Sequence, residues 1–230
     1  MNQLYRQTMV AAALAVLGTV SSVASAANYT IDFKMFFDTS TSGNLFDTKT
    51  LNYSVATLTI SDLAGGNGVQ LALKQNNHDF DNLGNAGNFV DALWLKGPGG
   101  TLNSLSGPAL AAGSGYSASP FVKDEMYRYN WNVDFDGASF VEGQSAVLTL
   151  TGAGLTASTF TAITTASPST PIMLSLGNVG GAYGLPAMGN TVHFVGGAPV
   201  LVTAVPEPAS YALMGLGLVG LVWARRRHTA

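Results

Sequence analysis

Two aspartates, Asp134 and Asp136, stand at the end of a stretch in which apolar and polar residues alternate. On a continuing β-strand, side chains two residues apart share a face and lie about 7 Å from each other. Glycoside hydrolysis uses two carboxyl groups roughly 5–9 Å apart. The spacing therefore admits a hydrolase as one hypothesis. Gly137 indicates that the strand ends here, and this position favours a solvated pair of carboxylates.

Nucleophilic catalysis by serine requires a histidine base and an orienting acid. His78 and His193 are the histidines that precede the last 25 residues of the chain. The serine segment Gly115–Ser119 (GYSAS) lacks the final glycine of a G-x-S-x-G elbow. We expect His193 to be a structural residue on a strand and His78 to be solvated in a polar loop. The sequence thus predicts a protein that is not an enzyme.

Oxygen-bearing side chains are concentrated in the segment 75–88, QNNHDFDNLGNAGN. Hard cations such as Ca²⁺ prefer carboxylate and amide oxygens. The candidate ligands are Asp79, Asp81, Asn82 and Asn85. An EF-hand loop that started at Asp79 would have Val90 where the bidentate glutamate belongs, so this is not an EF-hand. We expect no cofactor, with a weak calcium site in this loop as the alternative.

Sugar binding would need exposed aromatic rings beside amides and carboxylates. Trp94 and Trp131 are the candidates, and Asn130, Asn132 and Asp134 lie near Trp131 in the sequence. Trp131, however, alternates with other apolar residues, as the buried face of a strand does. We expect both tryptophans in the core and keep carbohydrate binding as the second hypothesis for them.

Charge and cysteine content exclude several classes of protein. The chain has no cysteine, which removes thiol catalysis and cysteine-ligated metals. Residues 27–204 carry six basic and twelve acidic residues, a net charge of −6. Nucleic-acid binding needs a basic face that neutralises phosphates, so the sequence predicts no nucleic-acid partner.

The first 26 residues have the order of a secretory signal. One cation, Arg6, precedes the apolar run Met9–Val20, and the small residues Ala24 and Ala26 follow where signal peptidase cuts. We predict a signal peptide over residues 1–26, with a helical apolar part, and a mature chain that starts at Ala27.

The other end of the chain resembles a membrane anchor. Residues 209–224 carry no charge and are followed by Arg225, Arg226 and Arg227. A transmembrane helix takes about 20 apolar residues, with roughly 17 as the lower limit. Basic flanks remain cytoplasmic, so the arginines predict a single span with the body on the opposite side of the membrane.

The motif Val205-Pro206-Glu207-Pro208 precedes this span. Motif, apolar span and terminal arginine cluster, in this order, resemble the PEP-CTERM sorting signal of Gram-negative bacteria. The resemblance implies recognition by a membrane-embedded exosortase and cleavage near Pro-Glu-Pro. It also implies a transient inner-membrane tether, then association with exopolysaccharide, biofilm or the cell surface.

The segment between the two ends reads as a series of short strands. Alternating or β-branched runs predict strands at 29–37, 53–60, 69–74, 88–96, 127–135, 144–151, 171–176 and 191–195, with 199–203 as a further candidate. Residues 97–115 are rich in glycine, serine and proline and predict a long loop. About eight strands with no helical period favour an all-β, antiparallel sandwich or jelly roll.

Three regions follow from these patterns: a signal peptide at 1–26, a β-sandwich body at 27–204 and a sorting tail at 205–230. The leading hypothesis is a secreted, non-enzymatic surface or matrix protein whose partners are signal peptidase, an exosortase and exopolysaccharide. A calcium-dependent carbohydrate-binding module is the second hypothesis, and an extracytoplasmic hydrolase is the third.

Overall fold

The computed structural model describes residues 27–37, 48–76, 87–123, 127–160, 172–179, 190–202 and Gly217. The predicted signal peptide and, apart from Gly217, the predicted sorting tail lie outside these residues. The candidate calcium ligands Asp79, Asp81, Asn82 and Asn85 also lie outside them. The structure therefore bears on the body of the chain.

The body is all-β and antiparallel, which confirms the predicted fold class. The strands are β1 (Asn28–Phe37), β2 (Thr48–Thr50), β3 (Ala56–Asp62), β4 (Gly68–Gln75), β5 (Phe89–Leu95), β6 (Thr101–Ser106), β7 (Gly115–Lys123), β8 (Tyr127–Asp134), β9 (Ser145–Thr151), β10 (Ile172–Val179), β11 (Asn190–Gly196) and β12 (Val200–Val202). Two short 3-10 turns, η2 (Gly137–Ser139) and η3 (Ala157–Phe160), complete the described elements.

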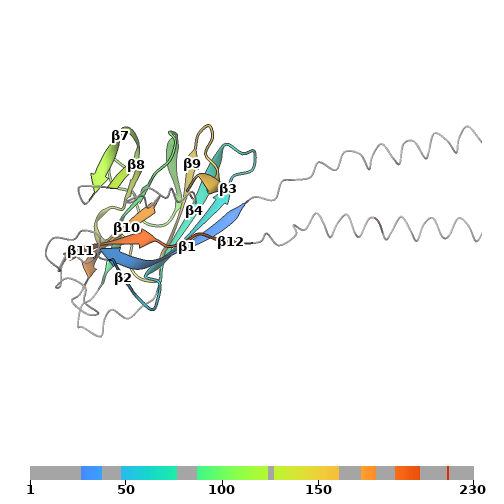
Figure 1. The fold of residues 1–230 in the computed structure, drawn as a ribbon. Coiled ribbons are helices and arrows are strands. Elements are labelled where there is room, and N and C mark those ends of the chain that lie inside the picture. Colours follow the sequence, from blue (N-terminus) through green and yellow to red (C-terminus); the bar gives the residue numbers. More distant parts are fainter. Residues whose placement is uncertain are drawn as a thin grey trace, which may run out of the picture.

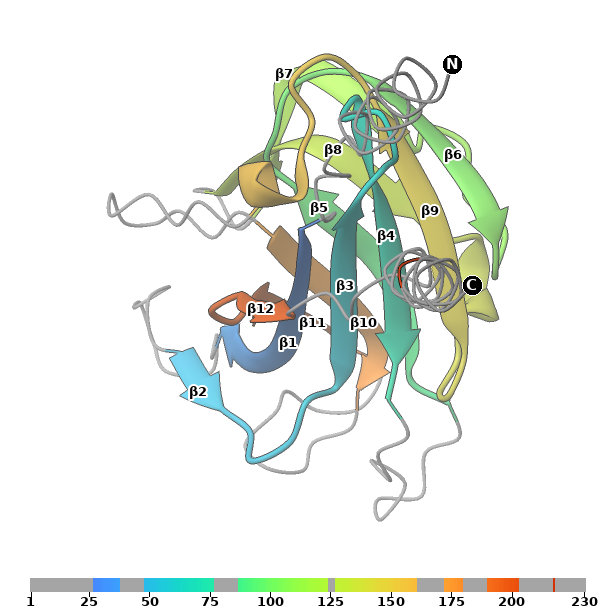
Figure 2. The ribbon, with the colours of Figure 1, turned by 90° about the vertical axis from the view of Figure 1, so that its right-hand side faces the viewer.

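All twelve strands belong to one hydrogen-bonded sheet, with the order β6-β9-β4-β3-β1-β11-β10-β5-β8-β7. The short strands β2 and β12 both pair with β1. The sheet rolls on itself, so that its two halves face each other (Figures 1 and 2). We call β6, β9, β4, β3 and β1 the first layer, and β11, β10, β5, β8 and β7 the second layer.

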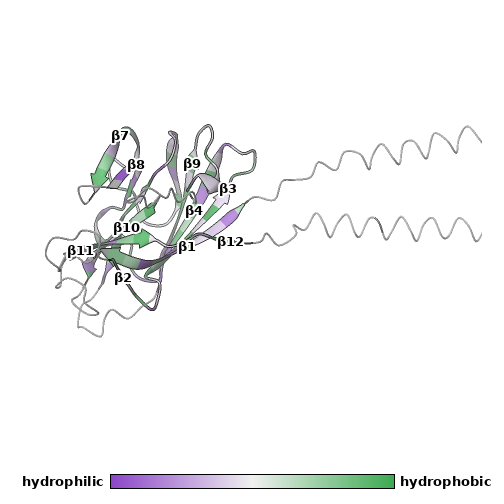
Figure 3. Cartoon of the chain, viewed as in Figure 1, coloured by the Kyte–Doolittle hydropathy of each residue, from purple (hydrophilic) through white to green (hydrophobic). Residues whose placement is uncertain are grey.

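The main core lies between the two layers. Alternate side chains of β3, β4 and β9 are buried, for example Leu58, Leu71 and Leu148, because successive side chains of a strand point to opposite faces. Across from them, β5, β8 and β10 contribute aliphatic residues and Trp131. Figure 3 shows the hydrophobic stretches on β10 and β11 in green. A second, smaller buried cluster comprises Ala92, Trp94, Tyr129, Met173 and Val195.

The prediction of a loop over residues 97–115 is wrong, because β6 lies within it and pairs with β9. The sequence pattern hides β6, whose side chains are mostly exposed and so do not alternate. Glycines permit the pairing: a Cβ on Gly100 would collide with the Thr151 carbonyl, and Gly107 has a positive φ of 108°. The strands β2 and β7 were also not predicted, and the count of about eight strands was too low.

The two ends of the described body lie side by side. Asn28, at the start of β1, is the ladder partner of Val202, at the end of β12. The side chains of Val200, Leu201 and Val202 are all exposed, so the β12–β1 ladder depends mainly on backbone hydrogen bonds. Segments that precede residue 27 and follow residue 202 therefore attach to the same end of the body.

Candidate functional site: a neutral polar face on the first layer

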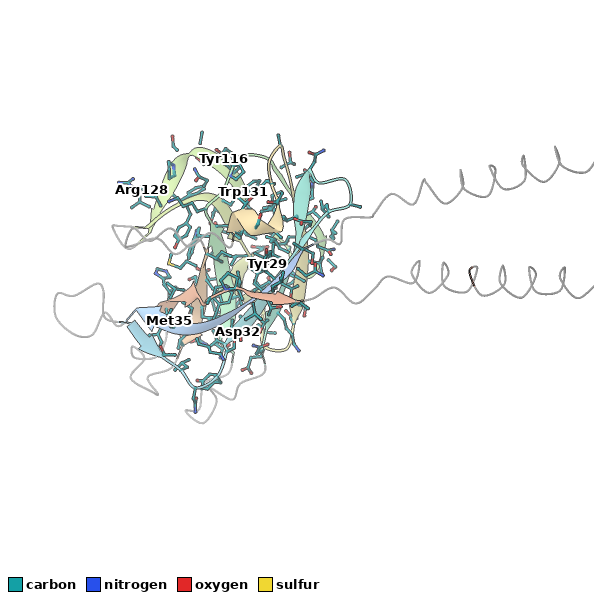
Figure 4. The ribbon with its side chains drawn as sticks, turned by 45° about the vertical axis from the view of Figure 1, so that its right-hand side comes forward. Tyr29, Asp32, Met35, Tyr116, Arg128 and Trp131 are labelled. Carbon is teal, nitrogen blue, oxygen red and sulfur yellow. The ribbon has the colours of Figure 1, made fainter. Side chains whose placement is uncertain are left out.

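The tryptophans considered for sugar binding are both buried. Trp131 has no exposed surface, donates its Nε1–H to the Pro98 carbonyl at 2.9 Å and contacts the Tyr116 ring edge to face. Figure 4 shows these two rings next to each other. Trp94 is 3% exposed and stands edge to face with the His193 ring, 5.5 Å between centroids. Neither tryptophan presents the exposed face that stacking on a sugar requires.

The two aspartates do not continue along one strand. β8 ends at Asp134, and Asp136 precedes the 3-10 turn η2 as an exposed residue. Asp134 accepts a hydrogen bond from Asn132 Nδ2 at 2.5 Å. The strand therefore ends between the two carboxylates, close to the end that Gly137 indicated in the sequence. In the described ranges, no group of three or more histidine, aspartate or glutamate residues could hold a metal ion.

His193 lies opposite Ser175 in the β10–β11 ladder. Ser175 donates its hydroxyl to Asp91 Oδ2 at 3.3 Å and has no exposed surface. Serine, histidine and aspartate thus come close together, although sequence spacing gave no sign of it. The serine hydroxyl is directed to the carboxylate and is inaccessible to a substrate. We interpret this cluster as part of the packing of the second layer.

The outer side of the first layer carries a surface of a different kind, which the sequence analysis missed. We call it the polar face: Asn28, Thr30, Asp32, Thr57, Thr59, Ser61, Gln70, Ala72, Lys74, Asn103, Ser145, Val147 and Thr149. Figure 2 looks onto this side, where β3, β4 and β9 lie next to one another. In the sequence, this face is indicated by a threonine or serine at every second position, as in Thr57-Leu-Thr-Ile-Ser61 and Thr149-Leu-Thr151.

Ladder registers align these side chains in rows. One row crosses five strands through Asn28, Ser61, Gln70, Thr149 and Asn103. Neighbouring strands of a sheet lie about 4.8 Å apart, so the row aligns hydroxyl and amide groups at a regular spacing. Thr149 is the least accessible member of the row, at 8% exposure. All five side chains are uncharged, and each can both donate and accept hydrogen bonds.

A shallow hollow of about 330 Å³ lies at one end of the polar face. Thr57, Thr59, Lys74, Asn76 and Ser145 are among its lining residues. Asn76 Nδ2 donates to Thr57 Oγ1 at 3.1 Å, and Thr57 Oγ1 donates to Asp32 Oδ1 at 3.1 Å. These bonds hold the polar side chains in place before any ligand arrives, which lowers the entropy lost on binding.

The arrangement can form many weak hydrogen bonds with a hydroxylated ligand. Its side chains are short, so fixing them costs little conformational entropy. The residues of the polar face include no aromatic ring for stacking and no nucleophile paired with a base. The face is therefore suited to binding, and an extended polymer with a repeating structure would make the most contacts.

Beyond the all-β body, whose ends lie side by side, the sequence continues into the Pro-Glu-Pro motif and the apolar run that follows it. The comparison with protein families identifies this segment: the PEP-CTERM protein-sorting motif matches residues 204–227. The chain therefore carries a PEP-CTERM sorting motif in this segment, as the resemblance in its sequence indicated. Searches of the curated proteins and of the solved structures returned no match.

The motif indicates an extracytoplasmic protein that is sorted by an exosortase. It implies secretion, a C-terminal sorting signal that anchors the chain in a membrane, and a cell-surface or extracellular destination. No helix of the described residues has the length and apolar character needed to cross a membrane.

Proposed function

We propose that this chain is a non-enzymatic protein of the cell surface or extracellular matrix, and that its polar face binds exopolysaccharide. The observation that carries the proposal is the row of uncharged hydroxyl and amide side chains across five strands. Hydrogen bonds to single sugar units are weak on such a surface. A long polymer compensates because many units bind together.

In this proposal the two ends of the chain serve export. Signal peptidase cuts after Ala26, and the apolar tail tethers the chain in the inner membrane with Arg225–Arg227 on the cytoplasmic side. An exosortase then cleaves near Pro206–Pro208 and releases the body to the surface or matrix. Because Asn28 and Val202 are neighbours, the body is held by one end throughout, which leaves the rest of its surface accessible.

The test measures binding of the exported protein to exopolysaccharide from its host by co-sedimentation. Thr59→Glu places a charged, longer side chain in the middle of the polar face, between Thr30 and Ala72. Ala138→Glu, in the exposed turn η2, adds the same charge elsewhere and is the matched control. We expect the first variant to lose most of its binding and the control to retain it.

Three outcomes would overturn the proposal or part of it. Equal binding by both variants would exclude the polar face. Binding that disappears with a chelator and returns with Ca²⁺ would favour the calcium-dependent module, with Asp79, Asp81, Asn82 and Asn85 as the candidate ligands. Release of new reducing ends from the polymer would show a hydrolase, and the Asp134→Asn and Asp136→Asn variants would then test the carboxylates.

A further inference from the structure

Strand β6 lies at one edge of the sheet that the described strands form. Among the described strands it pairs with β9 alone, and no ladder joins it to β7 at the other end of the sheet. β6 and β7 approach each other near Gly99, where a Cβ would lie 3.0 Å from the Tyr116 ring. Beyond that point, Asn103, Ser104, Leu105 and Ser106 are all exposed. Among the described residues no strand pairs with the outward backbone groups of β6, and such a strand edge can accept another strand.

The region around this edge carries no charge. Residues 97–122 contain no aspartate, glutamate, lysine, arginine or histidine, although residues 27–204 have a net charge of −6. Two copies of an acidic body repel each other over most of their surface. At an uncharged edge this repulsion is weakest, so the charge distribution favours contact between copies there.

β6 contains no proline, lysine or inward-pointing charge, three of the features that protect an edge strand, although its pairing with β9 is irregular between Ser104 and Ser106. At the opposite edge, β7 contains Pro120, and its pairing with β8 is also irregular, between Tyr116 and Phe121. In contrast, β6 exposes an apolar side chain, Leu105, which is 58% accessible. The two edge strands of the sheet therefore differ in sequence: β7 is interrupted by a proline, and β6 is not.

We propose that β6 is a self-association surface, on which a second copy of this chain adds its own β6 in antiparallel orientation. A two-fold axis relates antiparallel strands of identical sequence, so one patch serves both partners. The first layers of the two copies then form one continuous sheet. The polar faces become adjacent on one side of this sheet. The proposal does not depend on glycan binding.

A cysteine scan tests the geometry directly, because the chain has no cysteine of its own. Single cysteines replace each residue from Thr101 to Ser106 in the full chain, expressed in a host with an exosortase, and the exported protein is reduced and reoxidised. Antiparallel pairing about a two-fold axis brings just one position opposite itself. Disulfide formation needs Cβ atoms about 4 Å apart.

We expect the yield of disulfide-linked dimer to peak at one position of β6 and to fall on either side. Thr57→Cys, in the middle of the first layer, is the control and should give background dimer. Six variants at the level of this control would overturn the proposal, and so would a flat profile across the six.

Sedimentation velocity of the exported protein over a concentration series gives an independent readout. Leu105→Lys should raise the dimer dissociation constant by about tenfold or more, since like charges directly opposite each other destabilise paired strands. The matched control is Val200→Lys on β12, where the valine is 64% exposed. Association that is lost with Val200→Lys and kept with Leu105→Lys would place the interface at β12 and contradict the proposal. A monomer at all concentrations would also contradict it.

Discussion

At the residue scale, one carboxylate joins three parts of the body. Asp62 Oδ1 accepts a hydrogen bond from the Ala157 amide at 2.6 Å, and Oδ2 accepts one from Ala27 N at 3.2 Å. If signal peptidase cuts after Ala26, Ala27 N becomes the charged amino terminus. The contact is then a charge-assisted hydrogen bond, which is stronger than a neutral one. Processing of the signal peptide would in this way add to the stability of the fold.

Asp62→Asn is therefore expected to lower the free energy of unfolding of the exported protein by about 1–2 kcal/mol, because the charge and one acceptor are lost. Urea denaturation measures the change. Asp136→Asn is the control, since Asp136 is exposed and makes no side-chain capping bond, and should change stability by less than about 0.5 kcal/mol. Equal stability of the two variants would contradict the role of Asp62.

A substitution of Trp131 distinguishes a structural role for this residue from a role in sugar binding. Trp131→Phe removes the hydrogen bond to the Pro98 carbonyl and leaves a small void. We expect a loss of about 2 kcal/mol in unfolding free energy, with unchanged binding to polysaccharide, measured by denaturation and co-sedimentation. Unchanged stability together with lost binding would instead make Trp131 part of a sugar site.

Some residue environments could be predicted from the sequence and others could not. The alternation around Trp131 predicted its burial, because period two along a strand separates core from solvent. The contact of Ser175 with Asp91 could not be predicted. It depends on β10 lying beside β5, and these strands are distant in the chain.

At the scale of elements, the β6–β9 ladder requires glycine at its end. Gly107 has a φ of +108°, and a Cβ there would lie 2.7 Å from Ser145 O and Ala146 Cα. Gly113 has a similar φ of +95° but open space around it. Substitutions at Gly107 and Gly113 therefore distinguish the free-energy cost of a positive φ from the additional cost of a steric clash with β9.

We expect Gly107→Ala to destabilise the protein by about 2–3 kcal/mol and Gly113→Ala by about 1 kcal/mol, as strain at a positive φ alone would give. Chemical denaturation compares the two variants. Equal losses of unfolding free energy in the two variants would contradict this expectation. They would show that the close contact between Gly107 and β9 does not contribute to stability.

Most of the strands that the sequence predicted have a buried face, with the exposed β12 as an exception, whereas the edge strands β6 and β7 were not predicted. The predicted ranges overlap β1, β3, β4, β5, β8, β9, β10, β11 and β12. In contrast, β6 (TLNSLS) and β7 (GYSASPFVK) contain two serines each, and β7 contains a proline. These strands form because a neighbouring strand provides backbone hydrogen-bond partners. Intrinsic strand propensity does not include this tertiary contribution, so it could not predict them.

At the scale of the whole molecule, the sequence predicted the cellular destination of the protein more clearly than its activity. The sorting motif at residues 204–227 is a local pattern, whose three parts lie in register in the sequence. The polar face needs five strands in the order β6-β9-β4-β3-β1, and consecutive strands supply just one of those neighbours, β3 and β4. No reading of periodicity gives that order, so the face could be recognised only in the folded body.

The measurement that tests the central claim most directly is the intact mass of the protein from the surface and medium fractions of its native host. An exosortase-sorted matrix protein should start near Ala27 and end near Pro206–Pro208, without the apolar tail. A species that retains Tyr211–Ala230 in both fractions would show that the tail is a permanent anchor. It would contradict both the processing and the matrix role proposed for this chain.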